Sequence, residues 1–320
     1  CSSKGRDGTK IGACSNLSAV TNIMQAIVYT KYGSPDNLEL KEVEKPHPKD
    51  NEVLIKVHAA SINSWDWDML TGKPLEYRIL SGLYKPTKTN ILGCDIAGRI
   101  EAVGRDIKAF SQGDEVFGDL CEGSWGGFAE YVCARESELT IKPSSMTYEE
   151  AAATPQAGLL AYQGLCNTKK VEQGQQILIN GAGGGVGSFA IQLAKTFGAV
   201  VTGVDCTSKM NMIRSLGADH FIDYTNEDFT KNGKYYDLIL DVRTDRPIFD
   251  YRRALHPDGI YLTVGGKTSR ILQLVLLGPL ISMTGSRKLS LVLHKPNKDL
   301  NILAKLFENG KLKPVIDRCF

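Results

Sequence analysis

The sequence predicts an α/β chain of two parts, a small β-rich part followed by a doubly wound parallel sheet covered by helices. Three observations carry this prediction. Short β-type runs alternate with turn signals up to about residue 145, helices interleave with short apolar strands from about Thr147, and a glycine-rich turn at 181–187 joins a strand to a helix. The length of 320 residues also favours two domains over one.

The chain begins with a segment that does not read as part of either domain. Residues 1–23 are polar, lack periodicity and precede Met24, the first methionine. We expect them to be a disordered or non-native extension. A mature lipoprotein terminus at Cys1 stays open as an alternative, since no signal peptide is present to test it.

The first domain is expected over residues 24–146 as a β-rich, barrel-like unit. Its short runs have the composition of strands and are separated by Gly, Pro, Asn and Asp residues, which favour turns. The expected strands are 25–30, 38–43, 52–61, 95–103, 115–118 and 127–133.

The second domain is expected over residues 147–285. Its strands are short and wholly apolar, which is typical of a parallel sheet buried on both faces. They are expected at 176–180, 200–204, 220–223, 238–242 and 259–264. A helix over 210–216 ends at Gly217, and another over 299–308 ends at Asn309-Gly310, as glycine at helix C-termini predicts. One more strand is expected over 314–320.

The glycine-rich turn has the pattern of a dinucleotide site. Ala182, Gly184 and Gly187 fit A-x-G-x-x-G between an apolar strand and an amphipathic helix, with Gly183, Gly185 and Val186 filling the spacing. The small residues allow a tight turn, close approach of a pyrophosphate and close packing of helix on strand. The next strand ends at Asp205, about 20 residues after the central glycine, where a ribose-binding acid is expected. The motif predicts a Rossmann domain; a glycine turn that binds nothing is the alternative.

Composition excludes several classes of protein. The formal net charge is +2 with the basic residues scattered, so nothing favours nucleic acid as a partner. The 8 cysteines form no C-x-x-C pair, which argues against a structural zinc site or a disulfide scaffold and favours a reduced, cytoplasmic protein. The longest apolar run, 271–283, contains Gln273 and Pro279 and is too short to span a membrane.

Several stretches together resemble the medium-chain dehydrogenase/reductase superfamily, and within it the zinc-free quinone oxidoreductase (zeta-crystallin-like) branch. They follow the family's order along the chain and are 31–33, 51–63, 93–98, 112–118, 127–131 and 216–219. The resemblance implies a GroES-like catalytic domain before the Rossmann domain and a catalytic cleft between them. Residues 286–320 would return to the catalytic domain and are apparently truncated. Residues 281–285 resemble the edge strand through which family members form homodimers.

The resemblance also bears on metal binding. Zinc members of the superfamily hold the ion with a Cys, a His and a Cys, at positions that align here with Asn63, Cys94 and Gln156. Asparagine and glutamine are poor zinc ligands, and a single thiol does not hold the ion. We therefore expect no zinc and no other metal.

The activity that the resemblance implies is transfer of hydride from a nicotinamide cofactor to a quinone or an α,β-unsaturated carbonyl compound. Such acceptors are already electrophilic. The protein therefore has mainly to hold the acceptor against the nicotinamide in a cleft that excludes water, and to supply a proton. A nucleotide-binding but catalytically silent protein, with a crystallin-like or regulatory role, is the alternative.

Candidate catalytic residues follow the strand at 52–61. Asn63 and Asp66 keep the family's Asn-x-x-Asp spacing, so Asn63 is expected beside the nicotinamide and Asp66 either in catalysis or in fixing the loop. Trp65 and Trp67 either stack on a planar acceptor or pack in the core. Asp68 replaces a tyrosine that many quinone reductases carry, which puts tyrosine-assisted protonation in doubt. None of the five histidines stands in a catalytic pattern.

Residues around the second Rossmann strand leave the cofactor's identity open. Asp205 favours NAD(H), because a carboxylate accepts hydrogen bonds from a free 2′-hydroxyl and repels a 2′-phosphate. Against this, Lys209 aligns with a lysine that binds the 2′-phosphate of NADPH in the family, and Thr207 and Ser208 can donate hydrogen bonds to it. NADP(H) is favoured and NAD(H) stays possible. Further cofactor contacts implied by the resemblance are Tyr224, Asp241, Val242, Gly265 and Gly266.

Overall fold

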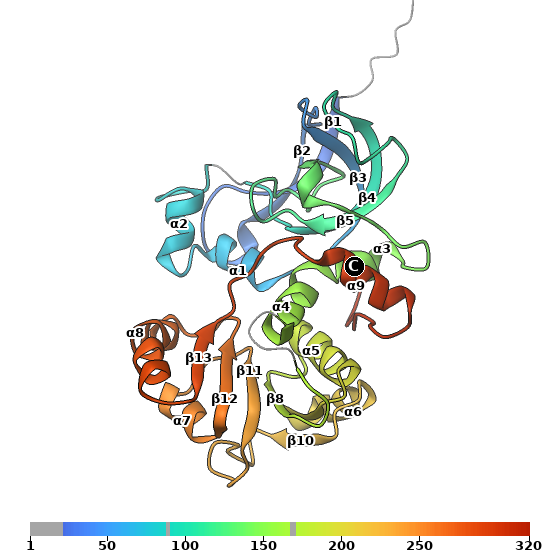
Figure 1. Cartoon of the computed structure of the whole chain (residues 1–320). Coiled ribbons are helices and arrows are strands. Elements are labelled where there is room, and N and C mark those ends of the chain that lie inside the picture. Colours follow the sequence, from blue (N-terminus) through green and yellow to red (C-terminus); the bar gives the residue numbers. More distant parts are fainter. Residues whose placement is uncertain (1–21, 88–89, 167–170) are drawn as a thin grey trace, which may run out of the picture.

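The computed structural model describes residues 22–87, 90–166 and 171–320. The expectation for residues 1–23 therefore lies almost wholly outside the described residues. Figure 1 shows a β-rich domain above and a sheet flanked by helices below, with the last helix returning to the region between them. Within the described ranges, no helix has both the length and the apolar content needed to cross a membrane. All six cysteines in these ranges are free thiols.

The first domain is built from two antiparallel sheets. A five-stranded sheet has the order β6-β3-β4-β5-β7, and β1 pairs with β2 beside it. Inward residues such as Val53, Ile55 and Ile96 form its core. The strands are β1 (Ile23–Tyr29), β2 (Leu38–Glu44), β3 (Glu52–Ala60), β4 (Asp95–Val103), β5 (Glu115–Asp119), β6 (Tyr131–Arg135) and β7 (Thr140–Ile141). The 3-10 helices are η1 (Pro35–Asn37) and η2 (Glu136–Glu138), and the α-helices between β3 and β4 are α1 (Ser64–Thr71) and α2 (Leu75–Ser81).

One expected strand of this domain starts later than the sequence predicts. The run 127–133 becomes a strand only from Tyr131, because its first residues are held by a different partner. The N–H of Gly127 donates to the Gly93 carbonyl at 2.9 Å, and the N–H of Phe128 donates to the Leu92 carbonyl at 2.9 Å. These two hydrogen bonds fix the loop that leads into β4, and Cys94 lies in that loop.

The second domain is a six-stranded parallel sheet with the order β10-β9-β8-β11-β12-β13. Its strands are β8 (Gln176–Asn180), β9 (Val200–Asp205), β10 (His220–Asp223), β11 (Tyr236–Asp241), β12 (Leu255–Thr263) and β13 (Lys288–Leu291). Its helices are α4 (Pro155–Cys166), α5 (Gly185–Thr196), η3 (Thr207–Lys209), α6 (Met210–Ser215), α7 (Ile248–Arg253) and α8 (Thr268–Thr284). Strand order reverses between β8 and β11, which is where open α/β sheets bind ligands at their carboxyl edge.

The edge of the Rossmann sheet differs from the prediction. Residues 281–284 form the last turn of α8, and Gly285 follows it, so the expected edge strand at 281–285 is wrong. The edge strand is β13, which pairs in parallel with β12. The run of Leu, Ile and Met before Gly285 has high helix propensity, and it continues the helix past the point where the resemblance places a strand. The Rossmann sheet therefore extends beyond the predicted boundary at 285.

The C-terminal segment returns toward the first domain. Helix α9 (Leu300–Glu308) packs against α4 and β7, and its Leu303 lies in one apolar cluster with Phe117 of β5 and Phe189 of α5. The strand expected over 314–320 is absent from the structure, which is without regular secondary structure there. Pro314 has no N–H to donate to a sheet. The backbone N–H and carbonyl of Lys313 are both hydrogen-bonded to the side-chain amide of Gln192 and are therefore not available to a neighbouring strand.

Candidate active site

The glycine turn lies where β8 meets α5, at the carboxyl edge of the sheet. Gly181 has φ +85°, a left-handed conformation that favours glycine. A Cβ atom on Gly187 would lie 2.2 Å from the Gly181 carbonyl oxygen, so only glycine lets the helix pack this closely. A Cβ atom on Gly184 would meet only that same oxygen, at 3.5 Å. The space above Gly184 is open, and the first N–H groups of α5 face it without helical acceptors.

Asp205 at the end of β9 ties this turn down. Its Oδ2 accepts the N–H of Gly183 at 2.8 Å, and its Oδ1 accepts the N–H of Cys206 at 2.8 Å. Both carboxylate oxygens are thus engaged by backbone donors of the site itself. Asp205, which the sequence predicts to bind the ribose, therefore holds the glycine turn in place in this structure.

Lys209 extends across the same turn. Its Nζ donates to the Gly183 carbonyl at 3.0 Å, and a Cβ atom on Gly183 would lie 2.3 Å from the Lys209 Cδ. Thr207 and Ser208 lie exposed beside it in η3. The Thr207 hydroxyl donates to a carboxylate oxygen of Asp223, and the Ser208 hydroxyl contacts the Cys206 sulfur at 3.1 Å. The exposed ammonium of Lys209 is therefore the cationic group beside the Asp205 carboxylate at Gly183.

Tyr224 follows β10 and is 44% exposed. Above its ring lies the guanidinium of Arg243, 5.9 Å from the ring centroid. Sequence reasoning missed Arg243, although its place directly after Val242 on the next strand was a usable signal. The pair brings a second cation and an aromatic face to the side of the sheet occupied by Lys209.

The turns after β11 and β12 complete the carboxyl edge. Asp241 is fully buried and accepts hydrogen bonds from the Asn180 amide and the Tyr261 hydroxyl, each at 2.8 Å. Its side chain therefore holds strands together, and Val242 is the half-buried residue that follows it. A Cβ atom on Gly265 would meet nothing within 4 Å, whereas Gly266 has φ +141°. Space is open above Gly265 as it is above Gly184.

Asn63 and Asp66 lie at the start of α1, which stands on the side of the first domain nearest the parallel sheet (Figure 1). Burial raises the pKa of Asp66 to about 6, although hydrogen bonds from the backbone N–H groups of Asn63 and Gly93, both 2.8 Å long, oppose the shift. Asp66 is 3% exposed, so it fixes the loop that presents Asn63. Trp67 is mostly exposed, and Trp65 packs edge-on against His294 at 5.3 Å between ring centroids.

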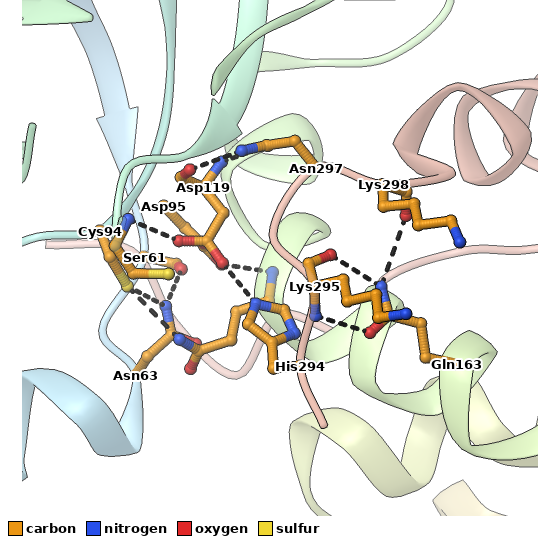
Figure 2. A network of polar contacts seen from close by, with 12 residues as sticks. Ser61, Asn63, Cys94, Asp95, Asp119, Gln163, His294, Lys295, Asn297 and Lys298 are labelled. Carbon is orange, nitrogen blue, oxygen red and sulfur yellow. Dashed lines mark hydrogen bonds and ion pairs between the residues drawn. The ribbon is translucent and has the colours of Figure 1, made fainter. Parts of the chain in front are cut away.

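The three positions that align with zinc ligands do meet in space, as the motif alignment predicts. The amide nitrogen of Asn63 lies 3.5 Å from the Cys94 Sγ, and that of Gln156 lies 3.6 Å from it. Figure 2 shows Asn63 directed at the sulfur, with Ser61 beside it. Both amides present N–H groups to the sulfur, and an N–H group does not bind a metal ion. These residues do not fit a zinc ion at the family's position.

A second cluster adjoins the first and was missed by sequence reasoning. The Nε2 of His294 lies 2.8 Å from Oδ2 of Asp119, whose other oxygen accepts the N–H of Cys121 at 2.9 Å. Asp119, Cys121 and His294 have possible ligand atoms within 4.8 Å of one another, as do Cys94, Asp95 and Asp119. Asp119 already accepts a hydrogen bond from the Cys121 backbone with one oxygen and contacts the His294 imidazole with the other. His294 lies only three residues after β13, which gave it no motif in the sequence.

Burial sets the protonation of this region. It raises the pKa of Asp95 well above its usual range, and the neighbouring Asp119 acts in the same direction. Burial likewise raises the pKa of the Cys94 thiol. The Oδ1 of Asp95 has no hydrogen-bond partner, so this carboxyl group is expected to be protonated. Asp119 and His294 then form the close carboxylate–imidazole pair of the cluster.

Comparison with known proteins agrees with this architecture. Residues 49–144 match the family of the alcohol dehydrogenase GroES-like domain, and residues 216–320 match the family described as zinc-binding dehydrogenase. The first match lies inside the predicted catalytic domain.

Curated relatives match over most of their length. The chain is 34% identical to a 2-methylene-furan-3-one reductase of Solanum lycopersicum, covering 93% of this chain and 73% of the relative. It is 32% identical to a chloroplastic quinone oxidoreductase of Triphysaria versicolor, covering 93% and 91%. It is 33% identical to an NADPH-dependent alkenal/one oxidoreductase of Arabidopsis thaliana, covering 95% and 75%.

A solved structure also matches the whole arrangement. The quinone oxidoreductase of Coxiella burnetii aligns with a TM-score of 0.82 at 31% identity, covering 93% of this chain and 92% of that one. The domain order, the glycine turn and these similarities agree with one another. The chain belongs to the medium-chain dehydrogenase/reductase superfamily, in its quinone oxidoreductase branch.

Proposed function

We propose that the protein is an NAD(P)H-dependent reductase of quinones or α,β-unsaturated carbonyl compounds. The observation that carries the proposal is the open space above Gly184 and Gly265 on the carboxyl edge of the sheet. A dinucleotide extended along this edge would place its pyrophosphate at the first turn and its nicotinamide at the second. The names of the three relatives, which are reductases of quinones, enones and a furanone, support the same chemistry.

The residues present suit an acceptor that needs no strong activation. When bound, the nicotinamide cofactor supplies the hydride. The protein supplies a loop fixed by Asp66 and, on that loop, the Asn63 amide, which would help to hold acceptor and cofactor in reactive order. A quinone or an enone is electrophilic enough to be reduced under these conditions.

The test is an assay in which the absorbance of NADPH reports its oxidation in the presence of each member of a panel of quinones and enones. We expect acceptor-dependent turnover. Confirmed NADPH binding without turnover across the panel would instead favour the catalytically silent alternative, which the enzyme names of the relatives do not support.

The favoured cofactor is NADP(H). Support comes from the two oxygens of Asp205, which are satisfied by backbone donors, and from the exposed cations Lys209 and Arg243 beside them. Replacing Lys209 by Ala is expected to raise the KM for NADPH by about 10- to 100-fold, since a hydrogen bond to a charged group contributes about 1.5–3 kcal/mol. The KM for NADH is the internal control and should change little. Equal losses with both cofactors would contradict a role at the 2′-phosphate.

We also propose that turnover needs no zinc. Dialysis against a strong chelator, with zinc measured before and after, is expected to leave NADPH oxidation unchanged. The reason is that Asn63 and Gln156 present N–H groups where zinc members carry ligands. Loss of activity that added zinc restores would contradict this proposal.

The homodimer and the cytoplasmic location stay predictions. If two copies pair through their Rossmann sheets, the strands at the two edges are β10 and β13, of which β13 lies closest to the predicted pairing segment 281–285.

A further inference from the structure

The cluster around His294 lies at the end of β13, near the sheet edge at which the nicotinamide is proposed to bind. Strand β13 runs parallel to β12, with Leu291 opposite Thr263, and the N–H of Val292 donates to the Thr263 carbonyl at 2.8 Å. The next residues of the two strands therefore leave the sheet side by side. His294 emerges beside the turn at Gly265, at the carboxyl edge where the nicotinamide is proposed to bind.

The first domain holds the imidazole from the other side. Its Nε2 pairs with Asp119 of β5, and the Trp65 ring packs against it in a T-shaped arrangement with 5.3 Å between ring centroids. The side chain of His294 is 5% exposed and that of Asp119 is 0% exposed. Figure 2 shows the ring directed into the same network as Asn63 and Cys94. The imidazole thus joins the two walls of the proposed cleft.

One nitrogen of the His294 ring has no hydrogen-bond partner within the described part of the protein. Nδ1 of His294 is buried and has no hydrogen-bond partner, which is costly for a polar group. An imidazolium held by a carboxylate at Nε2 has a proton at Nδ1 to give.

We propose that His294, held by Asp119, donates the proton that completes reduction of the acceptor, directly or through one water molecule. This proposal rests on the proposed function. In an enone, the β-carbon gains the hydride with its two electrons, the carbon–carbon double bond shifts toward the carbonyl, and the oxygen becomes an enolate. The Nδ1–H bond then breaks, its proton forms an O–H bond, and the imidazole is left neutral. The enol tautomerises to the saturated ketone, and solvent returns a proton to the ring.

Titratable groups on several elements face His294. Asp119 and Cys121 face it from β5 and the turn that follows, Asp95 and Cys94 lie behind Asp119 on and before β4, and Asp66 lies on α1. Lys295 is its neighbour in the chain, and the backbone of Lys295 is held by the Gln163 side chain of α4. An imidazolium donor is competent at low pH, so turnover should fall as the pH rises through the titration of His294.

Replacing His294 by Gln is expected to lower kcat with an enone by about 100-fold or more, which is the usual contribution of a general acid. The Kd for NADPH should stay close to that of the parent protein, whereas the unfolding temperature should fall because Asp119 loses a buried partner. The matched control is His256→Gln, at the amino end of β12 and therefore at the opposite edge of the sheet, which should turn over normally.

Two further variants separate donation of a proton from holding of the loop. Asn297 binds the backbone N–H and carbonyl of Asp119, so Asn297→Ala loosens the same segment and leaves the imidazole in place. In Asn297→Ala, kcat should fall at the same pH as in the parent protein. In Asp119→Asn, kcat should fall at a lower pH, because the imidazolium has lost the carboxylate that stabilises its charge. Histidine NMR signals of the protein without cofactor, assigned with His294→Gln, should show the same displacement in Asp119→Asn.

A parent-like kcat and pH profile in His294→Gln would overturn the proposal. If that variant does not fold, an unmoved profile and unmoved NMR titration in Asp119→Asn would overturn it. Loss of the pH dependence in Asn297→Ala as well would assign the segment a purely structural role. Absence of turnover in the parent protein with every acceptor would count against the proposed function itself, and the NMR titration would still test the Asp119–His294 pair.

Discussion

Replacing Gly184 by Val is expected to abolish NADPH binding while leaving the protein folded. Gly184 has φ −92° and ψ 177°, an extended conformation that valine adopts without strain. An added Cβ would meet only the Gly181 oxygen at 3.5 Å, an ordinary contact, so the apo protein loses no packing. The remaining methyl groups would project into the open space where the pyrophosphate is proposed to lie.

The expected loss of affinity is at least about 100-fold, because the pyrophosphate would forfeit charge-assisted hydrogen bonds of about 1.5–3 kcal/mol each at the start of α5. Fluorescence titration with NADPH measures it, and thermal unfolding of the apo protein supplies the control. Binding as tight as in the parent would show that the pyrophosphate lies elsewhere. An unfolded variant would show that the turn is less open than the structure indicates.

Patterns local in sequence predicted most of the fold. The strands at 95–103, 176–180 and 220–223 have the predicted bounds, because each is a short β-type run flanked by turn residues. The errors lie where packing with distant residues decides. Residues 281–284 are helical because they continue α8 toward a glycine, and 314–320 forms no strand because no sheet edge pairs with it in the described structure.

The site divides in the same way. The glycine turn and the meeting of Asn63, Cys94 and Gln156 were visible as motifs, since each belongs to a fixed spacing along the chain. His294 was not, because its partner Asp119 is 175 residues away and only the crossover after β13 brings them together. Asp241 shows the converse case, in which a residue at the predicted strand end turns its side chain into the sheet, and its contact with the cofactor stays a prediction.

Replacing Gly187 by Ala is expected to destabilise the Rossmann domain, in contrast to the change at Gly184. The new methyl group would lie 2.2 Å from the Gly181 oxygen and within 2.7 Å of two Ala182 backbone atoms. These neighbours are backbone, so α5 has to move away from β8. Overpacking of this kind costs about 1–3 kcal/mol or more, whereas alanine returns only about 1 kcal/mol in helix propensity.

The unfavourable effect therefore wins, and we expect the midpoint of thermal unfolding to fall by several degrees, with NADPH affinity reduced because the turn itself is displaced. Gly184→Ala is the matched control, since its methyl group meets the same oxygen at 3.5 Å. It should unfold at the temperature of the parent. If Gly187→Ala were as stable as that control, the helix could not be packed on the turn as closely as the structure shows. The two glycines would then share one role, whereas their geometry assigns cofactor access to Gly184 and helix packing to Gly187.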